Sequence, residues 1–269
     1  MAIVLDNITY TYGVGTPFEK TALKGISVTI ENGEFLGIIG HTGSGKSTFV
    51  QHLNGLLHPT TGKVTVNGVD VSEKTDEAKH MRHKVGMVFQ YPEHQLFEET
   101  IAEDIAFGPK NLGLDAEEVD RRVREAMAFV GLDYDTYAER SPFHLSGGQM
   151  RRVAIAGVVA MEPDFLVLDE PSAGLDPFGR EEIFDEIIKL HKEKDVTVIL
   201  VSHNMEDISR MANRLIVLDK GQIVLDGKPL DIFNHHRHVL QQVGVDVPPV
   251  SVLIELLRNR GLDVSNEVL

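Results

Sequence analysis

A glycine-rich loop between an apolar run and an amphipathic helix constrains the fold of this chain most. The run Phe35–Ile39 ends at Gly40, and the loop GHTGSGKS that starts there fits the pattern G-x-x-x-x-G-K-[ST]. A helix is predicted from Ser47, and its apolar face holds Phe49, Val50, Leu53, Leu56 and Leu57. Buried strand, glycine loop and helix in this order are the context that a phosphate-binding loop requires. The sequence therefore predicts an α/β fold that binds a nucleoside triphosphate.

The residues of this loop suit a phosphate chain with a bound magnesium ion. Gly43 and Gly45 lack a Cβ atom, so nearby backbone N–H groups can close around phosphate oxygens at a helix N-terminus. Lys46 can reach the β- and γ-phosphates, and the Ser47 hydroxyl is a natural Mg²⁺ ligand. A tight turn that binds nothing is the alternative, which the flanking strand and helix disfavour. The predicted nucleotide-binding residues here are Gly40, His41, Thr42, Gly43, Ser44, Gly45, Lys46, Ser47 and Thr48.

The order of the remaining apolar runs predicts a mostly parallel sheet. Phe165–Leu168 and Val196–Val201 look like buried strands, and Ser172–Lys194 between them is expected to be a crossover helix. Repeated strand-helix-strand units favour parallel pairing. Residues 92–160 are helical in character and include a charged amphipathic helix, Ala116–Val130. Other predicted strands and hairpins are Ile3–Leu5, Ile8–Tyr12, Ile26–Ile30, Val64–Val69, Val85–Phe89 and Leu215–Leu225.

Two carboxylates follow the predicted strand Phe165–Leu168. Asp169 and Glu170 end this strand, and the C-terminal end of a parallel strand faces the ligand crevice. There Asp169 would hold Mg²⁺ through water, and Glu170 would orient or deprotonate the attacking water. For these two residues alone, an acidic strand end that caps the next helix would be the stronger interpretation. With the phosphate-binding loop upstream, the catalytic interpretation becomes the stronger one.

The pentapeptide Leu145–Gln149, with the sequence LSGGQ, predicts a second anion-binding loop. Ser146 and the amides of Gly147 and Gly148 would bind a γ-phosphate. The helix that follows is expected over Met150–Ala160, so a Ser-capped helix is the alternative. Nothing within one chain explains a second anion site, whereas the ATP of a second subunit does.

The two loops together resemble those of the ATP-binding-cassette (ABC) ATPases, in which two cassettes clamp ATP between the P-loop of one and the LSGGQ signature of the other. The resemblance covers about residues 3–226. It implies an α/β P-loop NTPase fold, with a RecA-like and mostly parallel sheet, an N-terminal antiparallel β-subdomain, and an α-helical subdomain at about residues 91–160. Residues 1–226 would form the ATPase domain. Residues 227–269 would form a C-terminal extension with a dimerisation role.

The resemblance also implies catalytic roles for two residues at strand ends. Gln90 is similar to the Q-loop glutamine, which contacts Mg²⁺ and links the core to the helical subdomain. His203 is similar to the switch histidine, which donates a hydrogen bond to the γ-phosphate. With Glu170 they make up the predicted catalytic residues. A lone glutamine or histidine at a strand end is otherwise a solvated surface residue.

Two further resemblances concern the dimer interface and the adenine. Ser172–Asp176 resembles the D-loop that crosses the dimer interface, although Asp176 before Pro177 also fits an ordinary helix N-terminus. Tyr12 would stack on adenine as the family's aromatic loop residue does. Tyr10 is the alternative, and a plain strand tyrosine competes with both.

Finer stretches are similar to the energy-coupling factor (ECF) transporter ATPases, which are related to the cobalt-importer ATPase. The stretches are Gly15–Glu19, Tyr91–Thr100, Ala106–Asn111 and Val247–Val250. The run Leu145–Val158 is most similar to the second of the two paired ATPases. Phe178 departs from the more usual polar residue.

This resemblance implies an ATP-hydrolysing subunit that powers the import of vitamins or metal ions. Its partners would be a second ABC ATPase, a paralogue rather than a second copy, and a transmembrane coupling protein. Substrate-binding membrane proteins would be served indirectly. The subunit would lie at the cytoplasmic face of the cell membrane, with ATP and Mg²⁺ bound.

Composition excludes several other classes of protein. The formal net charge of −15 repels nucleic acid and anionic lipid, so membrane attachment should run through a protein partner rather than lipid insertion. There is no cysteine, which excludes disulfides and thiolate metal sites. No run approaches the roughly 20 apolar residues of a membrane helix. The N-terminus has no basic segment, so a signal peptide is not expected.

Some interpretations stay open. The ATPase could serve a different importer or act on nucleic acid, and a monomeric P-loop kinase would leave Leu145–Gln149 unexplained. The histidine-rich run His235–His238 is read as a solvated linker rather than a metal site. An acidic segment after Gln90 is either a solvated face or a groove for a basic helix of a membrane partner. Its acidic residues are Glu93, Glu98, Glu99, Glu103 and Asp104.

Overall fold

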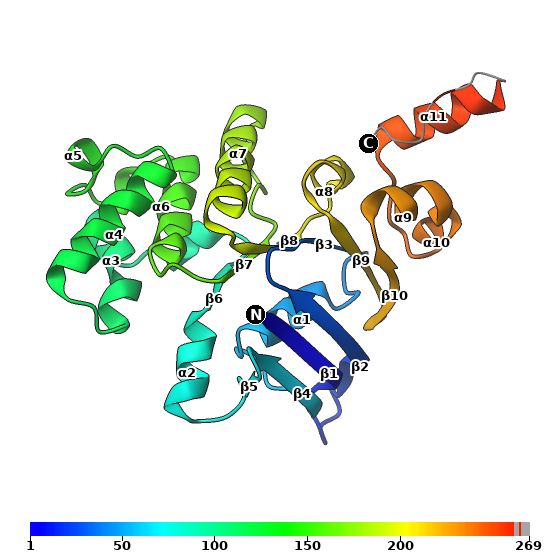
Figure 1. The fold of residues 1–269 in the computed structure, drawn as a ribbon, viewed down its shortest axis with the longest axis horizontal. Coiled ribbons are helices and arrows are strands. Elements are labelled where there is room, and N and C mark those ends of the chain that lie inside the picture. The colour runs from blue at the N-terminus through cyan, green and yellow to red at the C-terminus, as the bar shows by residue number, and fades with distance from the viewer. Residues whose placement is uncertain (261–263, 265–269) are drawn as a thin grey trace. The chain divides into compact units, whose positions relative to one another are not determined.

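The three apolar runs predicted as buried strands are confirmed in a computed structural model of the protein. They form β3 (Phe35–Ile39), β7 (Phe165–Asp169) and β8 (Thr197–Val201), and every residue of the three strands is buried. Strands buried on both faces are typical of a parallel sheet covered by helices. The pairing is parallel, as predicted, between β3 and β8 and between β3 and β9 (Arg214–Asp219) (Figure 1).

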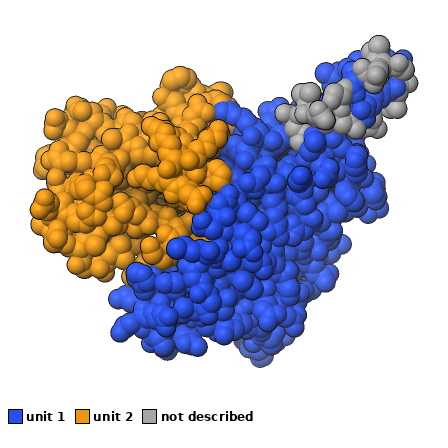
Figure 2. Space-filling model, viewed as in Figure 1, with its two compact units in different colours: residues 1–82, 197–269 blue, residues 83–196 orange. Residues whose placement is uncertain are grey.

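The structure describes residues 1–260 and 264, and the chain divides into two compact units. Unit 1 is made of residues 1–82 and 197–269, and unit 2 of residues 83–196 (Figure 2). Residues 261–263 and 265–269, the end of the predicted C-terminal extension, lie outside the described residues.

An antiparallel sheet forms the N-terminal part of unit 1. Its strands, in the order β2-β1-β4-β5, span Lys20–Glu31, Ala2–Tyr12, Thr61–Val66 and Val69–Asp70. The prediction of two separate strands before Tyr12 is wrong, because β1 runs on through a register shift beside Asn7, where φ is 47°. The hairpin of β4 and β5 is confirmed, with Asn67 and Gly68 both at positive φ in its turn.

The parallel part of unit 1 places β3 between β8 and β9. The strand order is β10-β9-β3-β8, and β10 (Gln222–Gly227) forms the predicted hairpin with β9. Lys220 and Gly221 make its two-residue turn at φ 47° and 81°, which suits the right-handed twist of the strands. The helices of unit 1 after β3 are α1 (Lys46–Leu53), α2 (Asp76–His83, whose last residue falls in unit 2), α8 (Met205–Met211), α9 (Pro229–His235), α10 (Arg237–Gln242) and α11 (Pro249–Asn259).

The helix after the glycine loop is shorter than predicted. α1 ends at Leu53, and Gly55 has φ 71°, a left-handed conformation that stops the helix. Leu56 is therefore not on a buried helical face and is 55% exposed. Leu57 also lies outside the helix.

Unit 2 contains a parallel strand pair and a bundle of helices. β6 (Val85–Val88) pairs with β7. Helices α3, α4 and α6 pack against one another (Figure 1). The helices after β6 are the 3₁₀ helix η1 (Pro92–Gln95), α3 (Ile101–Asn111), α4 (Ala116–Phe129), α5 (Tyr134–Tyr137), η2 (Pro142–His144), α6 (Gly147–Val159) and α7 (Pro177–Lys194).

Two helix starts in unit 2 differ from the prediction. The crossover helix begins at Pro177 rather than Ser172, because Asp176 caps it and Pro177 fits the first helical position. The helix after the pentapeptide begins at Gly147 rather than Met150, because Ser146 is its N-cap.

The three histidines of the histidine-rich run are exposed, but the run is not a linker. His235 ends α9 and His238 lies within α10. Among the described residues, no group of three or more His, Asp or Glu side chains could hold a metal ion. Within the same residues, no helix is long and apolar enough to cross a membrane.

Candidate nucleotide-binding site

Glycine is required by close backbone contacts at two positions of the loop between β3 and α1. A Cβ atom on Gly40 would stand 2.3 Å from Leu218 O, and one on Gly45 would stand 2.9 Å from Ala22 O. Both residues have positive φ, 155° and 109°, which disfavours a side chain further. These two glycines therefore fix the conformation of the loop that leads into α1.

The cationic and hydroxyl groups expected to meet phosphate lie at this helix start. Lys46 is buried, and its Nζ donates to Gly40 O at 2.6 Å and to His41 O at 3.2 Å. Ser47 is exposed in the first turn of α1, where its hydroxyl can reach a ligand. Ser44 Oγ is fully buried, and no hydrogen-bond partner for it exists among the described residues. This donor set and the helix N-terminus suit a phosphate with its Mg²⁺ ion.

The two candidate adenine-binding tyrosines lie differently. Tyr12 is 42% exposed, and its hydroxyl lies 3.1 Å from Thr48 Oγ1 in the first turn of α1. Tyr10 is more buried and contacts the ring of His52 edge to face, with centroids 4.9 Å apart. An exposed ring beside the phosphate-binding helix can stack on a base, so this geometry favours Tyr12 over Tyr10.

Unit 1 also brings His203 to the edge of the sheet where the loop lies. Ile38 of β3 pairs with Val201 of β8 in parallel register. The loop from Gly40 and the residue His203 therefore leave neighbouring strands at the same, C-terminal edge, the usual ligand edge of such a sheet. His203 is exposed.

Unit 2 brings the other three strand-end residues together. Val88 of β6 pairs with Leu168 of β7, so Gln90, Asp169 and Glu170 follow at one edge of this strand pair. Asp169 is buried and Gln90 is exposed. Glu170 has φ 53°, a conformation that residues other than glycine seldom adopt. Strained backbone of this kind is found where the surrounding structure holds a functional side chain in place.

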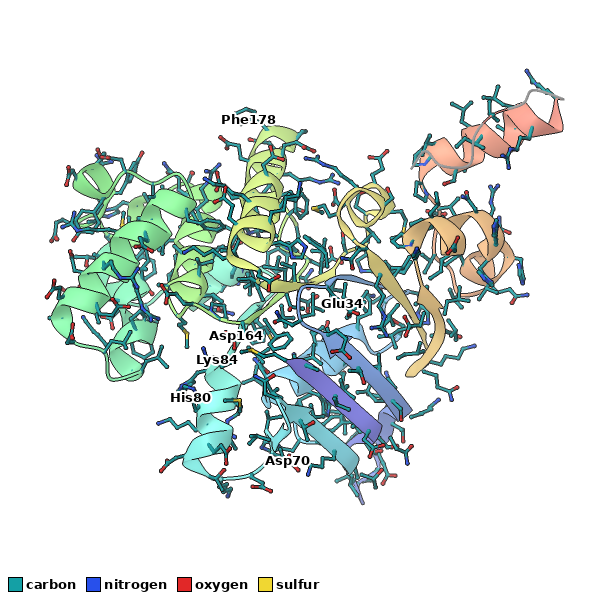
Figure 3. The ribbon with its side chains drawn as sticks, in the orientation of Figure 1. Glu34, Asp70, His80, Lys84, Asp164 and Phe178 are labelled. Atoms are coloured by element: carbon teal, nitrogen blue, oxygen red, sulfur yellow. The ribbon has the colours of Figure 1, made fainter. Side chains whose placement is uncertain are left out.

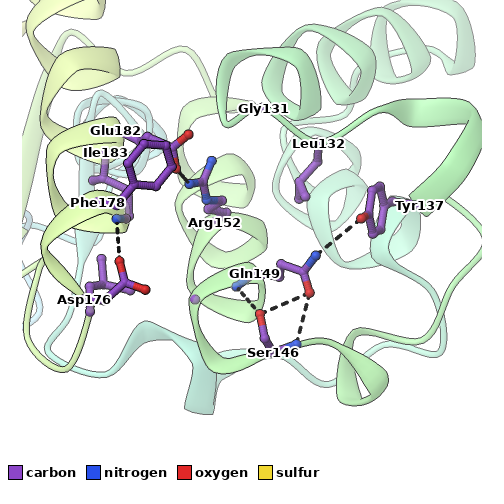
Figure 4. Close-up of a pocket in the computed structure, with 13 residues that line it drawn as sticks. Gly131, Leu132, Tyr137, Ser146, Gln149, Arg152, Asp176, Phe178, Glu182 and Ile183 are labelled. Carbon is purple, nitrogen blue, oxygen red and sulfur yellow. Dashed lines mark hydrogen bonds and ion pairs between the residues drawn. The ribbon is translucent and has the colours of Figure 1, made fainter.

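The pentapeptide forms the N-terminus of α6 with a complete capping box (Figure 4). Ser146 Oγ accepts from Gln149 N, and Ser146 N donates to Gln149 Oε1 at 3.1 Å. Gln149 Nε2 also donates to Tyr137 Oη at 3.3 Å. A Cβ atom on Gly147 would meet nothing within 4 Å. The amide end of α6 is thus rigid and open on its glycine side.

A pocket of about 290 Å³ lies beside this helix end. Its lining includes Ser146 and Gln149 on one side and Asp176 and Phe178 on the other (Figure 4), together with Gly148 and Leu175. Asp176 Oδ1 accepts from Gly179 N at 2.7 Å, which caps α7. Phe178, at the start of α7, is 74% exposed (Figure 3). The signature and D-loop segments therefore share one surface of unit 2.

A buried arginine joins three of these segments, and the sequence analysis missed it. Arg151 of α6 forms an ion pair with Glu93 of η1, with Nε and Nη2 both 3.1–3.2 Å from the carboxylate oxygens. Its Nη1 donates to Ala173 O, within the D-loop segment. Arg151 lies four residues before Ile155, on the buried face of α6, and this spacing is the one signal that could have found it.

The acidic segment after Gln90 is only partly a surface feature. Glu93 is held by Arg151, and Asp104 accepts from Phe97 N and Glu98 N. Burial is the main cause that raises the pKa of the Asp104 carboxyl above its usual value. Of the two interpretations left open for this segment, the solvated face does not hold for Glu93 and Asp104.

Comparison with known proteins decides the family. The family description "ABC transporter" matches residues 23–173. An "energy-coupling factor transporter ATP-binding protein EcfA2" of Clostridium perfringens (strain 13 / Type A) is 56% identical over 268 residues, covering 100% of this chain and 94% of that protein. The chain belongs to the ABC transporter family, among the ECF transporter ATP-binding proteins. As such it is an ATPase with the P-loop fold.

Two solved structures share this fold. One is cbiO1 from Clostridium perfringens, described as part of the ABC transporter complex cbiONQ, with 34% identity and a TM-score of 0.77, covering 94% of this chain and 98% of that one. The other is a dimeric post-hydrolysis state of the ATP-binding cassette MJ0796 bound to ADP and Pi. It has 32% identity and a TM-score of 0.75 over 84% of this chain and 98% of that one.

Proposed function

We propose that this ECF ATPase works as one half of a two-subunit ATP sandwich that drives the import of vitamins or metal ions. The observation that carries the proposal is the second anion site, the capped and open N-terminus of α6 at Ser146–Gln149. A P-loop can hold ATP by itself. A second loop with the same preference for anions makes sense when it meets the γ-phosphate bound by a partner subunit.

The binding residues divide between the two ends of the nucleotide. The loop from Gly40 to Thr48 surrounds the phosphates, and Tyr12 stacks on the adenine. From the partner subunit, the residues equivalent to Ser146–Gln149 close over the γ-phosphate. Asp176, which caps α7 beside the same pocket, lies in the segment that crosses the interface.

The catalytic residues act on the attacking water and the γ-phosphate. Glu170 orients or deprotonates the water, and its left-handed backbone fixes the direction of its side chain. His203 donates a hydrogen bond to the γ-phosphate. Gln90 links the nucleotide site to the helical segment that starts at η1.

Mg²⁺ fits the oxygen donors of these residues. The exposed hydroxyl of Ser47, the carboxylate of Asp169 and the amide oxygen of Gln90 are all hard oxygen ligands, which Mg²⁺ prefers. These three residues would hold the ion, which supplies charge neutralisation for the transferred phosphoryl group.

Transport would be driven by the closing and opening of the two-ATPase dimer around ATP. ATP joins the two subunits, and hydrolysis removes the phosphate that both hold, so the interface opens. A transmembrane coupling protein at the cytoplasmic face of the membrane receives this motion and passes it to substrate-binding membrane proteins. We expect the second ATPase to be a paralogue, and residues 227–269 to pack against it as an extension of an ATPase domain formed by residues 1–226.

Purification of the tagged chain from membranes of its own cell, in mild detergent, tests this function. We expect a second ATPase, a hydrophobic coupling protein and one or more small membrane proteins to copurify. Self-association alone, or an importer with a soluble binding protein, would contradict the ECF assembly and leave the ATPase mechanism intact. Copurified nucleic acid would contradict the transport function. A second test removes the extension from Gly227, and unchanged dimerisation would refute its packing role.

A further inference from the structure

The turn between β9 and β10 contacts the nucleotide-binding loop at three places within unit 1. Asp219 Oδ1 lies 3.0 Å from His41 Nε2. Gly221 N donates to Ser44 O at 2.9 Å. Leu218 O lies so close to Gly40 that a Cβ atom there would stand 2.3 Å from it. A hairpin some 178 positions away in the sequence therefore supports the loop along most of its length.

The turn is itself held against the antiparallel sheet. Lys24 N donates to Gly221 O at 2.8 Å. A Cβ atom on Gly221 would stand 2.3 Å from Ala22 O, so the backbone of β2 packs directly on the turn. The turn is thus fixed to β2 on the side away from the loop. A contact from the turn can therefore restrain the loop.

The side chain of His41 contacts this hairpin directly. Its Nε2 faces the Asp219 carboxylate, and its Nδ1 lies 2.7 Å from Thr42 O. A carboxylate and a carbonyl only accept hydrogen bonds, so the imidazole ring can act toward them only as a donor, from Nε2 to Asp219 or from Nδ1 to Thr42. Asp219 is only 19% exposed in its side chain, so the charge-assisted bond is partly shielded from water.

The backbone after α10 comes near the Cβ atom of His41. A Cβ atom on Gly244 would stand 3.9 Å from His41 Cβ, an ordinary van der Waals contact. The ring itself is placed by its carboxylate partner and by its own loop.

We propose that Asp219 is a positioning residue of the ATP site, which acts through His41 to hold the loop in its phosphate-binding shape. The His41 carbonyl that accepts from Lys46 belongs to the same residue whose ring Asp219 holds. When a loop is already held in its binding shape, the ligand does not have to order it. The apparent affinity is then higher, because it is proportional to the fraction of molecules in the binding-competent state. The proposal rests on the proposed ATP-binding function of this loop.

The test compares Asp219→Asn and His41→Gln with a matched control on the same hairpin. Asp226 also carries an ion pair, 2.7 Å from Arg214, but it lies at the far end of β10 from the turn. Asp226→Asn therefore removes an ion pair of the hairpin without touching the loop. The double variant of His41 and Asp219 measures whether the two side chains act as one unit.

The readouts are the Kd for MgADP by titration calorimetry and the KM and kcat for ATP of the purified transporter complex. We expect Asp219→Asn and His41→Gln each to raise the Kd and KM about tenfold, the value of one charge-assisted hydrogen bond, with kcat changed less than about twofold. The double variant should be no weaker than either single variant. Asp219→Glu, which keeps the carboxylate, should restore part of the affinity.

Three outcomes would overturn the proposal. One is a Kd for Asp219→Asn within twofold of the unmodified chain, another is additive effects in the double variant, and the third is an equal rise in Asp226→Asn. His41→Gln keeps the test valid if Asp219→Asn does not fold, because His41 is partly exposed. If the unmodified chain and Asp226→Asn fail to bind MgADP, the proposed function fails instead.

Discussion

The ion pair between Arg151 and Glu93 gives the sharpest prediction about the stability of unit 2. Their side chains are 3% and 16% exposed, so both charges are largely removed from water. Removing one partner of a buried pair leaves an uncompensated charge and costs about 3–5 kcal/mol. We expect Glu93→Gln to lower the unfolding free energy at the low end of this range, because Ala173 O still accepts from the arginine.

A second pair from the same helix is the control. Arg152 pairs with Glu182, whose side chain is 41% exposed. Exposed ion pairs contribute about 0–1 kcal/mol, so Glu182→Gln should leave stability nearly unchanged. The contrast between the two glutamate variants isolates burial, because each replaces one carboxylate by an amide.

Thermal unfolding of the full chain measures both variants. At about 2–4 °C per kcal/mol, Glu93→Gln should lower the Tm by about 10 °C and Glu182→Gln by less than about 4 °C. Glu93→Leu combined with Arg151→Met should recover most of the loss, because an apolar pair carries no desolvation cost. Equal Tm shifts for the two glutamate variants would refute the reasoning, as would a double variant no better than Glu93→Gln.

Four other predictions follow from the site in unit 1 and from the catalytic glutamate. Lys46→Ala should lose ATP affinity, and unchanged nucleotide binding in a titration would contradict the P-loop interpretation. Glu170→Gln should bind ATP but nearly abolish turnover, so hydrolysis at the unmodified rate would remove its assigned role. Tyr12→Ala should weaken ATP binding about tenfold, since stacking on a base is worth about 1–3 kcal/mol, whereas Tyr12→Phe should bind normally; equal loss in both would point to the hydroxyl rather than the ring. Burial lowers the pKa of His52 below its usual 6.5, so the unfolded chain takes up the proton first and stability should fall as pH drops below about 6.5, by at most about 1.4 kcal/mol per pH unit. His52→Gln should flatten this slope in urea unfolding at pH 7.5 and 5.5, and an unchanged slope would exclude His52 as its source.

Local sequence was enough to predict the strand, loop and helix around the P-loop. The apolar run of β3 and the spacing of Gly40, Gly45 and Lys46 act within one short segment, so their pattern is complete in the sequence. The parallel pairing of β3 and β8 agrees with the mostly parallel sheet predicted from the repeated strand-helix-strand units, which did not say which strands are neighbours. The end of α1 was predicted too late, because the apolar spacing of Leu56 favoured a longer helix. The left-handed backbone of Gly55 stops the helix before that residue.

Contacts between distant segments could not be predicted in the same way. Asp219 looked like an ordinary hairpin residue, and its bond to His41 depends on β9 lying next to β3. No role was assigned to Arg151 from the sequence, and only the fold shows that it pairs with Glu93. A sequence pattern records the chemistry of each residue, whereas partners of this kind are selected by topology.

The hydrogen bonds of Lys46 have a consequence for the rate of nucleotide binding. Its ammonium group already rests on the carbonyls of Gly40 and His41. The phosphate oxygens of an arriving nucleotide therefore replace these carbonyl oxygens as hydrogen-bond acceptors of an ammonium group that is already in place. No segment has to fold first. Association should then be governed by diffusion and long-range charge. Because ATP and a chain of net charge −15 repel each other, added salt should speed the encounter.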